Sequence, residues 1–188
     1  DAQILPFYLA DGSDDIALIR GRVASVGQVT RSILARHDYP EIVAILQAEA
    51  LALAACLSST LKFDGVFTLQ AKGDGLVRTL FADITDKGAL RGYAALDDNR
   101  AAFQAAAMAH DPTGPVRLGH VMGDGYIAFT VDDGNTNGRY QGIVELDNQH
   151  LSDAAMRWYE NSEQLDTVVV CAAAEGPDGW QAVAVMLQ

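Results

Sequence analysis

One stretch, residues 41–62 (EIVAILQAEALALAACLSSTLK), constrains the fold of this chain more than any other. Fourteen of the sixteen residues in 42–57 are apolar, and only Gln47 and Glu49 interrupt the run. Alanine and leucine dominate it, and both are strong helix formers. Pro40 stands directly before it, which is typical of a helix start. We therefore predict one helix from Glu41 to about Leu61.

This helix is apolar nearly all round, which is typical of a helix that is buried in a core or that crosses a membrane. The stretch is slightly short for a bilayer, it carries Glu49 near its middle, and no aromatic belt flanks it. We therefore expect a buried helix with a layer of structure on each side, because its small alanines let neighbouring layers approach closely.

The remaining chain alternates strand-like segments with turns. Hydrophobic patterning predicts helices at 27–37, 100–110 and 151–164, and strands at 4–9, 16–25, 66–72, 76–84, 89–96, 126–132, 139–146, 167–173 and 180–187. Pro6 favours an edge position for the first strand. The β-branched run 167–173 suggests a buried strand. Mostly hairpin-connected strands predict an α+β fold, with antiparallel sheets layered around the buried helix in a single domain over 1–188.

A short repeat is visible within this pattern. Gly73-Asp74-Gly75 and Gly123-Asp124-Gly125 each precede a strand, a turn and a second strand. Those second strands carry Arg91-Gly92-Tyr93 and Arg139-Tyr140-Gln141-Gly142. We interpret the two modules as a weak repeat of one hairpin.

Charge and cysteine content bear on partners and compartment. The formal net charge is −12, from 25 acidic and 13 basic residues, which opposes binding to nucleic acid or to an anionic membrane surface. Cys56 and Cys171 both lie in apolar runs, so we expect buried free thiols. Without a signal-peptide pattern, we expect a cytoplasmic protein.

Three patterns could carry chemistry, and each has a simpler explanation. The Gly-Asp-Gly loops could hold an anion, but no helix follows them, so turns are favoured. Glu49 in the buried helix could do proton chemistry with a shifted pKa, or could accept hydrogen bonds from its neighbours. The histidines at 37, 110, 120 and 150 lack metal-ligand spacing.

A fourth pattern resembles the start of a calcium-binding loop but lacks its last ligand. Asp133, Asn135, Asn137 and Gly138 match the start of such a loop, but the closing glutamate should stand at 144, which is valine. No catalytic constellation is found, so we expect no enzyme activity and no cofactor or metal in this chain.

A set of short segments runs across the whole sequence: Arg20-Gly21, His37-Asp38-Tyr39-Pro40, residues 49–53 starting at Glu49, Leu61-Lys62-Phe63-Asp64-Gly65, Gln70, Gly73-Asp74-Gly75, Arg91-Gly92-Tyr93-Ala94, Tyr140-Gln141-Gly142-Ile143-Val144, and Ser162-Glu163-Gln164-Leu165 with Thr167. In the order and spacing of these segments, the chain resembles the N-terminal domain of the heat-shock protein 33 family (33 kDa chaperonins). Asp166 departs from the family, which commonly has proline there. The family also continues past the position of Gln188 into a linker and a redox domain with Cys-x-Cys and Cys-x-x-Cys zinc ligands, which we expect this chain to lack.

The resemblance implies a holdase chaperone of the stress response that binds unfolded proteins without ATP. In the family, zinc-bound thiolates keep the client surface covered until oxidation releases the metal. It also implies a homodimer, in a sheet–helix–sheet fold that permits the exchange of segments between protomers. Two alternatives stay open: a small-molecule enzyme using Glu49 or the Gly-Asp-Gly loops, and a structural dimerisation module.

Overall fold

The computed structural model describes residues 2–10, 17–111, 114–132, 134, 138–147, 149–162 and 164–188. These residues form two antiparallel sheets. Sheet A has the order β1 (Ala2–Ala10), β2 (Ala17–Val26), β9 (Gly179–Leu187), β8 (Val168–Gly176). Sheet B has the order β5 (Leu90–Leu96), β4 (Val77–Thr85), β3 (Val66–Gly73), β6 (Gly125–Asp132), β7 (Arg139–Leu146). The helices are α1 (Gln28–Leu34), α2 (Glu41–Ser58), α3 (Arg100–Ala109), α4 (Leu118–Val121) and α5 (Leu151–Ser162).

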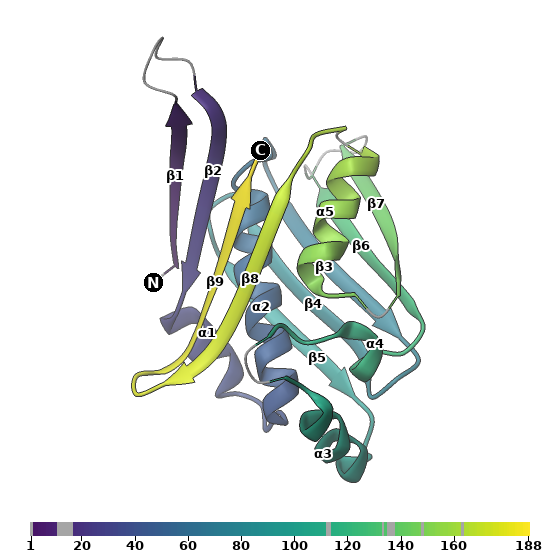
Figure 1. Cartoon of the computed structure of the whole chain (residues 1–188). Helices are drawn as coiled ribbons and strands as arrows, with labels where there is room; N and C mark the ends of the chain where they lie inside the picture. The colour runs from purple at the N-terminus through teal and green to yellow at the C-terminus, as the bar shows by residue number, and fades with distance from the viewer. Residues whose placement is uncertain are drawn as a thin grey trace.

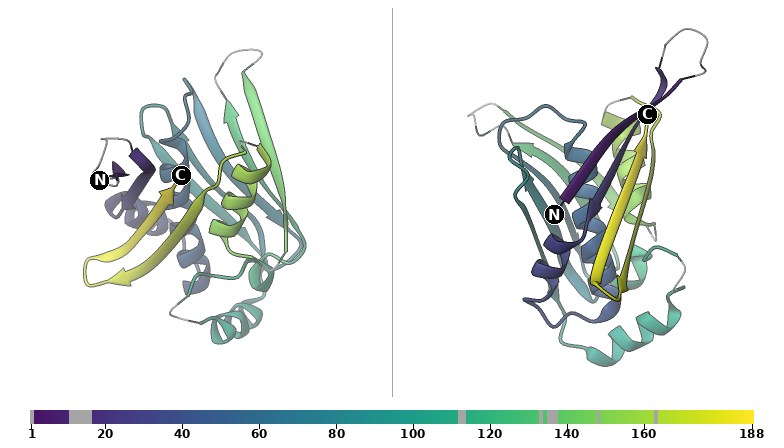
Figure 2. Two further views of the ribbon diagram at one scale, coloured as in Figure 1. Left: turned by 45° about the horizontal axis from the view of Figure 1, so that its top comes forward. Right: turned by 90° about the vertical axis from the view of Figure 1, so that its left-hand side faces the viewer.

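Helix α2 is the predicted central helix, and it lies between the two sheets (Figures 1 and 2). Leu46, Ala50, Leu53 and Leu57 lie on one side of the helix, and Leu51 and Ala52 lie on two other sides. None of the six has any exposed surface, so the helix is enclosed all round. By length and composition α2 could cross a membrane, but 89% of it is buried inside the protein, as expected of a core helix. The predicted α+β fold with a buried helix between antiparallel sheets is therefore confirmed.

The hydroxyl side chains after the apolar run explain where α2 ends. Ser58, Ser59 and Thr60 donate to the carbonyl oxygens three residues before them, at 3.0, 2.6 and 2.8 Å. Such bonds offer the backbone an alternative to the helical pattern. Helix α2 consequently ends at Ser58, a little before the predicted Leu61.

The hairpin repeat occupies both sides of β3. Strands β4 and β6 both pair with β3, and β5 and β7 pair with them as the outer strands. The two modules read from the sequence are thus the two hairpins β4–β5 and β6–β7, which flank the central strand of sheet B. The four-residue helix α4 was not predicted, because it is too short to show a period.

Helix α5 closes the space beside β7 and β8, and its buried side chains include Ala155, Trp158 and Tyr159. The Trp158 indole stacks on Phe129 with 4.8 Å between ring centroids. A Cβ atom at Gly142 would lie 2.3 Å from the Trp158 Nε1 atom. Glycine at 142 is therefore what allows α5 to pack directly on β7.

Candidate functional site

The face of sheet A that is turned away from α2 is apolar and uncovered. Side chains alternate between the two faces of a strand, and Ala24, Ala184 and Cys171 are buried on the α2 side. The opposite set therefore points outward. We call it the apolar face of sheet A, and it consists of Leu5, Phe7, Leu9, Ile19, Val23, Val168, Val170, Val183, Val185 and Leu187.

The strand register assembles these side chains into rows. Leu5 pairs with Val23, Val23 with Val185, and Val185 with Val170, so one apolar row crosses all four strands. The next row runs from Phe7 across Gly21 and Leu187 to Val168, and the Phe7 ring covers Gly21. Leu5 is 61% exposed and Val170 is 60% exposed, so water reaches both ends of the first row.

No charged side chain interrupts this face within the described residues. Its polar positions are Gln3, Ser25 and Gln181 in a protein whose net charge is −12. Strand spacing of about 4.8 Å and a rise of about 3.4 Å per residue give the two rows, together with the adjoining Leu9, Ile19 and Val183, an area of roughly 350 Å². Apolar patches of this size on a monomer often mark interaction sites.

A hollow adjoins one end of the apolar face. Its volume is about 390 Å³, and its apolar lining consists of Ile19, Val168 and Leu187 from the face itself with Met156 and Leu165. Glu160 and Asp166 place two acidic groups on its rim. The hollow gives the flat sheet a place where a side chain of another polypeptide could be enclosed.

Strand β1 forms one edge of sheet A, as Pro6 suggested, and much of it is exposed on both faces. Tyr8 points to the side opposite Leu5 and Leu9, yet it is 63% exposed. Figure 1 shows the β1–β2 hairpin at one side of the molecule, away from sheet B. An edge strand with unpaired backbone groups can add a strand from another chain.

The sequence interpretation of 167–173 as a buried strand is wrong in part. Val169 and Cys171 are buried, but Val168 and Val170 between them are exposed. An unbroken apolar run predicts a strand covered on both faces, whereas here only one face is covered. The sequence analysis therefore missed that Val168 and Val170 form part of an uncovered apolar face.

Glu49 is 1% exposed in the middle of α2. Burial raises its pKa to about 8, and a hydrogen bond from the backbone N–H of Val116 acts in the opposite direction. Its Oε2 atom has no hydrogen-bond partner among the described residues. The hollow beside the apolar face of sheet A does not include Glu49.

The two Gly-Asp-Gly loops contact each other. The Asp74 N–H donates to the Asp124 carbonyl oxygen at 3.1 Å, and the Asp124 N–H donates to the Asp74 Oδ1 atom at 2.9 Å. Gly123 has a φ of 67°, and a Cβ atom there would lie 2.3 Å from the Asp74 Oδ1 atom. The geometry agrees with the interpretation of both loops as turns, because the backbone N–H groups of Asp74 and Asp124 donate to each other's loop and not to an anion.

Two of the family-motif residues lie in one polar row on the outer face of sheet B. Asp83 accepts from Thr68 at 2.8 Å and pairs with Arg91 at 2.5 Å. Farther along the row, Gln141 donates to Thr130 at 2.8 Å. Thr68 and Thr130 are direct neighbours, so the row runs from β5 to β7.

Other motif residues shape the ends of elements. The Tyr39 hydroxyl accepts from the Ala94 N–H of edge strand β5 at 2.9 Å, and the His37 ring stacks on Tyr39 at 4.7 Å. Burial raises the Tyr39 pKa. Pro40 caps α2, and a Cβ atom at Gly92 would lie 2.4 Å from the Gln47 amide nitrogen of α2.

The remaining motif residues lie apart from one another. Arg20 exchanges two backbone hydrogen bonds of 2.9 Å with Gln188. Lys62 is exposed after α2, Phe63 packs on the core, and the Gly65 carbonyl accepts from Asp86. Ser162 ends α5, and Gln164 has a φ of 51°. The described residues do not include Glu163, the calcium-loop positions Asp133, Asn135 and Asn137, or the segment 11–15 between the first two strands.

The cysteines do not suit a zinc site. Both are buried and free, as predicted. Burial raises the pKa of Cys56 to about 12, and burial also raises the pKa of Cys171 well above its ordinary value. In the described part of the chain, no three His, Cys, Asp or Glu residues come together as metal ligands.

Fold and surface together define an α+β domain in which a buried helix separates two sheets and one sheet leaves an apolar face open. The sequence model of the family described as Hsp33 protein matches residues 4–188. The chain belongs to this Hsp33 family.

Similar proteins agree with this assignment. The 33 kDa chaperonin of Caulobacter vibrioides (strain NA1000 / CB15N) is 38% identical over 176 residues, which is 90% of this chain and 56% of that protein. The 33 kDa chaperonin of Pseudomonas savastanoi pv. phaseolicola is 36% identical over 188 residues, covering 100% of this chain and 56% of that protein. The chain thus spans about half the length of the curated relatives it matches.

A solved structure shares the fold. The crystal structure of the 33 kDa chaperonin (heat shock protein 33 homolog) from Thermotoga maritima aligns with a TM-score of 0.73 and 19% sequence identity. The alignment covers 97% of this chain and 60% of that one.

Proposed function

We propose that this chain is the client-holding part of an ATP-independent chaperone, and that the apolar face of sheet A is its holding surface. The observation that carries the proposal is the uncharged apolar face, in which rows of side chains cross four strands on an otherwise acidic protein. Unfolded polypeptides expose apolar side chains, and burying these against the face is favourable by about 25 cal/mol per Å² of area removed from water.

The relatives support the same activity, because they carry the name 33 kDa chaperonin. The acidic remainder of the surface would keep a complex with an unfolded client in solution. The cytoplasmic location and the role in stress that were expected from the sequence are part of this proposal.

The experiment is aggregation of a chemically denatured client, followed by light scattering after dilution into buffer with this protein. We expect suppression that grows with the ratio of protein to client and that is the same with and without ATP. Aggregation that proceeds unchanged at a molar excess of the protein would exclude the proposal. That result would favour the alternative function, a structural dimerisation module.

Homodimer formation is the second element of the proposal. Edge strand β1 carries Leu5, Tyr8 and Leu9 exposed on its two faces, and it has unpaired backbone groups along one side. Pairing or exchange of the β1–β2 hairpin between two copies would cover these groups. Sedimentation equilibrium measures this directly: a monomer mass of 20.1 kDa at all concentrations would contradict it.

A further inference from the structure

A groove of about 440 Å³ lies between α3 and the segment that leads into α2, well separated in sequence from the apolar face of sheet A. Its apolar part consists of Pro40, Leu96, Phe103 and Ala107. Phe103 is only 3% exposed and is anchored in the core, so it gives the groove a fixed apolar floor.

The groove is strongly acidic. Four carboxylates line it, from Asp38, Glu41, Asp97 and Asp98, against a single cation, Arg100. Arg100 lies 3.7 Å from Asp38, and Asp97 is paired outside the groove with Arg78 at 3.0 Å. Glu41 and Asp98 form no ion pair within the described residues, so their charges stay available to a ligand.

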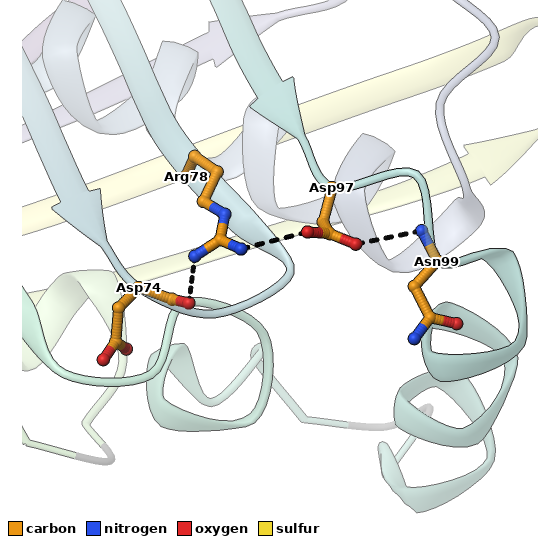
Figure 3. Close-up of polar contacts among 4 residues, drawn as sticks. All are labelled: Asp74, Arg78, Asp97 and Asn99. Atoms are coloured by element: carbon orange, nitrogen blue, oxygen red, sulfur yellow. Dashed lines mark hydrogen bonds and ion pairs between the residues drawn. The ribbon is translucent and has the colours of Figure 1, made fainter.

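Hydrogen bonds hold the α3 wall of the groove in place (Figure 3). Arg78 donates to the Asp74 carbonyl oxygen and to Asp97, and the Asp97 Oδ1 atom accepts from the Asn99 N–H at 3.1 Å. Asn99 in turn caps α3 by accepting from the Ala102 N–H at 3.1 Å. The start of α3 is therefore fixed relative to sheet B.

The opposite wall is fixed independently by Tyr39. Its hydroxyl accepts from Ala94 of β5, and its ring stacks on His37. Because both walls are tied to the same sheet, the groove is formed before any ligand arrives, which lowers the entropy cost of binding.

We propose that this groove binds a polypeptide segment that places a lysine or arginine beside a large apolar side chain. The apolar side chain would lie on Phe103 and Leu96, and the basic group would pair with Glu41 and Asp98. Charge complementarity of this kind selects among apolar segments and rejects acidic ones. The groove and the apolar face of sheet A share no residue, so this inference is independent of the proposed holding function.

The test is fluorescence anisotropy with a short labelled peptide in which leucine alternates with lysine. Two comparison peptides replace lysine with glutamate or leucine with serine. We expect the leucine–lysine peptide to bind at least tenfold more tightly than either, with an affinity that falls as salt is added. Equal binding of the leucine–glutamate peptide would overturn the proposal.

Three variants locate the peptide in the groove. Glu41→Gln with Asp98→Asn should weaken binding by about threefold to tenfold, from the usual worth of exposed charge pairs. Gln104→Arg, on the exposed side of α3, should also weaken it. Arg100→Gln should tighten binding by about twofold to threefold, because it removes the lone cation and releases Asp38. Damage to the fold cannot imitate a gain in affinity.

Matched controls change the same charges elsewhere. Asp86→Asn with Asp178→Asn removes two exposed carboxylates, and Arg157→Gln removes an exposed guanidinium that is paired with Asp147 at 2.9 Å. Neither should alter peptide affinity. An Arg100→Gln variant that binds no more tightly than Arg157→Gln would overturn the assignment. Loss of peptide binding in a variant with Val168→Thr and Val170→Thr, which changes only the apolar face of sheet A, would also overturn the assignment.

Discussion

Val170 of β8 lies directly opposite Val185 of β9, on the side of sheet A that faces away from α2. Val169, its neighbour in sequence, is buried against the core. Val169 and Val170 are neighbours in β8, but Val169 belongs to the core and Val170 to the apolar face of sheet A. Alternate residues of one apolar strand therefore build two different surfaces.

Leu53→Ala tests the central helix. Leu53 has no exposed surface, so the substitution should lower the free energy of unfolding by roughly 2–5 kcal/mol, from lost burial and the cavity left behind. Urea denaturation gives the value. Leu5→Ala on the exposed face is the control and should cost well under half as much; equal costs would mean that α2 is not the centre of the core.

Gly142→Ala tests the contact between α5 and β7. The new methyl group would lie 2.3 Å from the Trp158 Nε1 atom, and overpacking of this kind costs about 1–3 kcal/mol. Gly176→Ala is the matched control, because nothing lies within 4 Å of a Cβ atom there. Tryptophan fluorescence should shift only in Gly142→Ala, and an unshifted spectrum with full stability would refute the packing described.

The pH dependence of stability depends on Glu49. Burial raises its pKa to about 8 from an ordinary value of 4.5, so the folded protein keeps a proton that the unfolded chain loses first. The stability that the protonated Glu49 contributes is fully present below the pKa of the unfolded chain. It is lost as the pH rises through the pKa of the folded protein.

Glu49→Gln carries no titrating group and should escape this loss. Between about pH 5 and about pH 9, the free energy of unfolding of the variant should improve relative to the wild type by a few kcal/mol, at about 1.4 kcal/mol per pKa unit. Urea denaturation across this range supplies the measurement. A constant difference between the two proteins would show that Glu49 titrates normally.

Neither cysteine should respond to redox conditions in the folded protein. Burial raises the pKa of both thiols, and the thiolate is the reactive form. A thiol reagent should therefore label Cys56 and Cys171 only after denaturant is added. We also expect no bound zinc by mass spectrometry of the metal content, and equal suppression of aggregation with reductant and with peroxide. Activity that requires peroxide would contradict this prediction.

The sequence predicted the layered core because its strongest signal is one of composition. A helix that is apolar on every side, such as 42–57, has to be enclosed, so the two flanking layers follow from it. Pro6 likewise marked an edge strand, since proline cannot donate a ladder hydrogen bond. The hairpin repeat was visible because each copy carries its own turn residues.

The apolar face could not be predicted in the same way. Consecutive apolar residues in β8 and β9 look alike whether one face or both are covered, and only the sheet order shows what lies outside. The acidic groove was hidden for a similar reason. Asp38 precedes α2 and Glu41 begins it, whereas Asp98 and Phe103 come from a segment about sixty residues later, and only the fold brings them together.

The most direct test of the holding surface changes its exposed valines without changing strand propensity. Val168→Thr with Val170→Thr keeps both residues β-branched, and Ile143→Thr makes the matching change at a site that is equally exposed on sheet B. We predict that the double variant suppresses aggregation of a denatured client several-fold less well than the wild type, and that Ile143→Thr suppresses it as well as the wild type. Full suppression by a correctly folded double variant would contradict the assignment of the apolar face of sheet A as the holding surface.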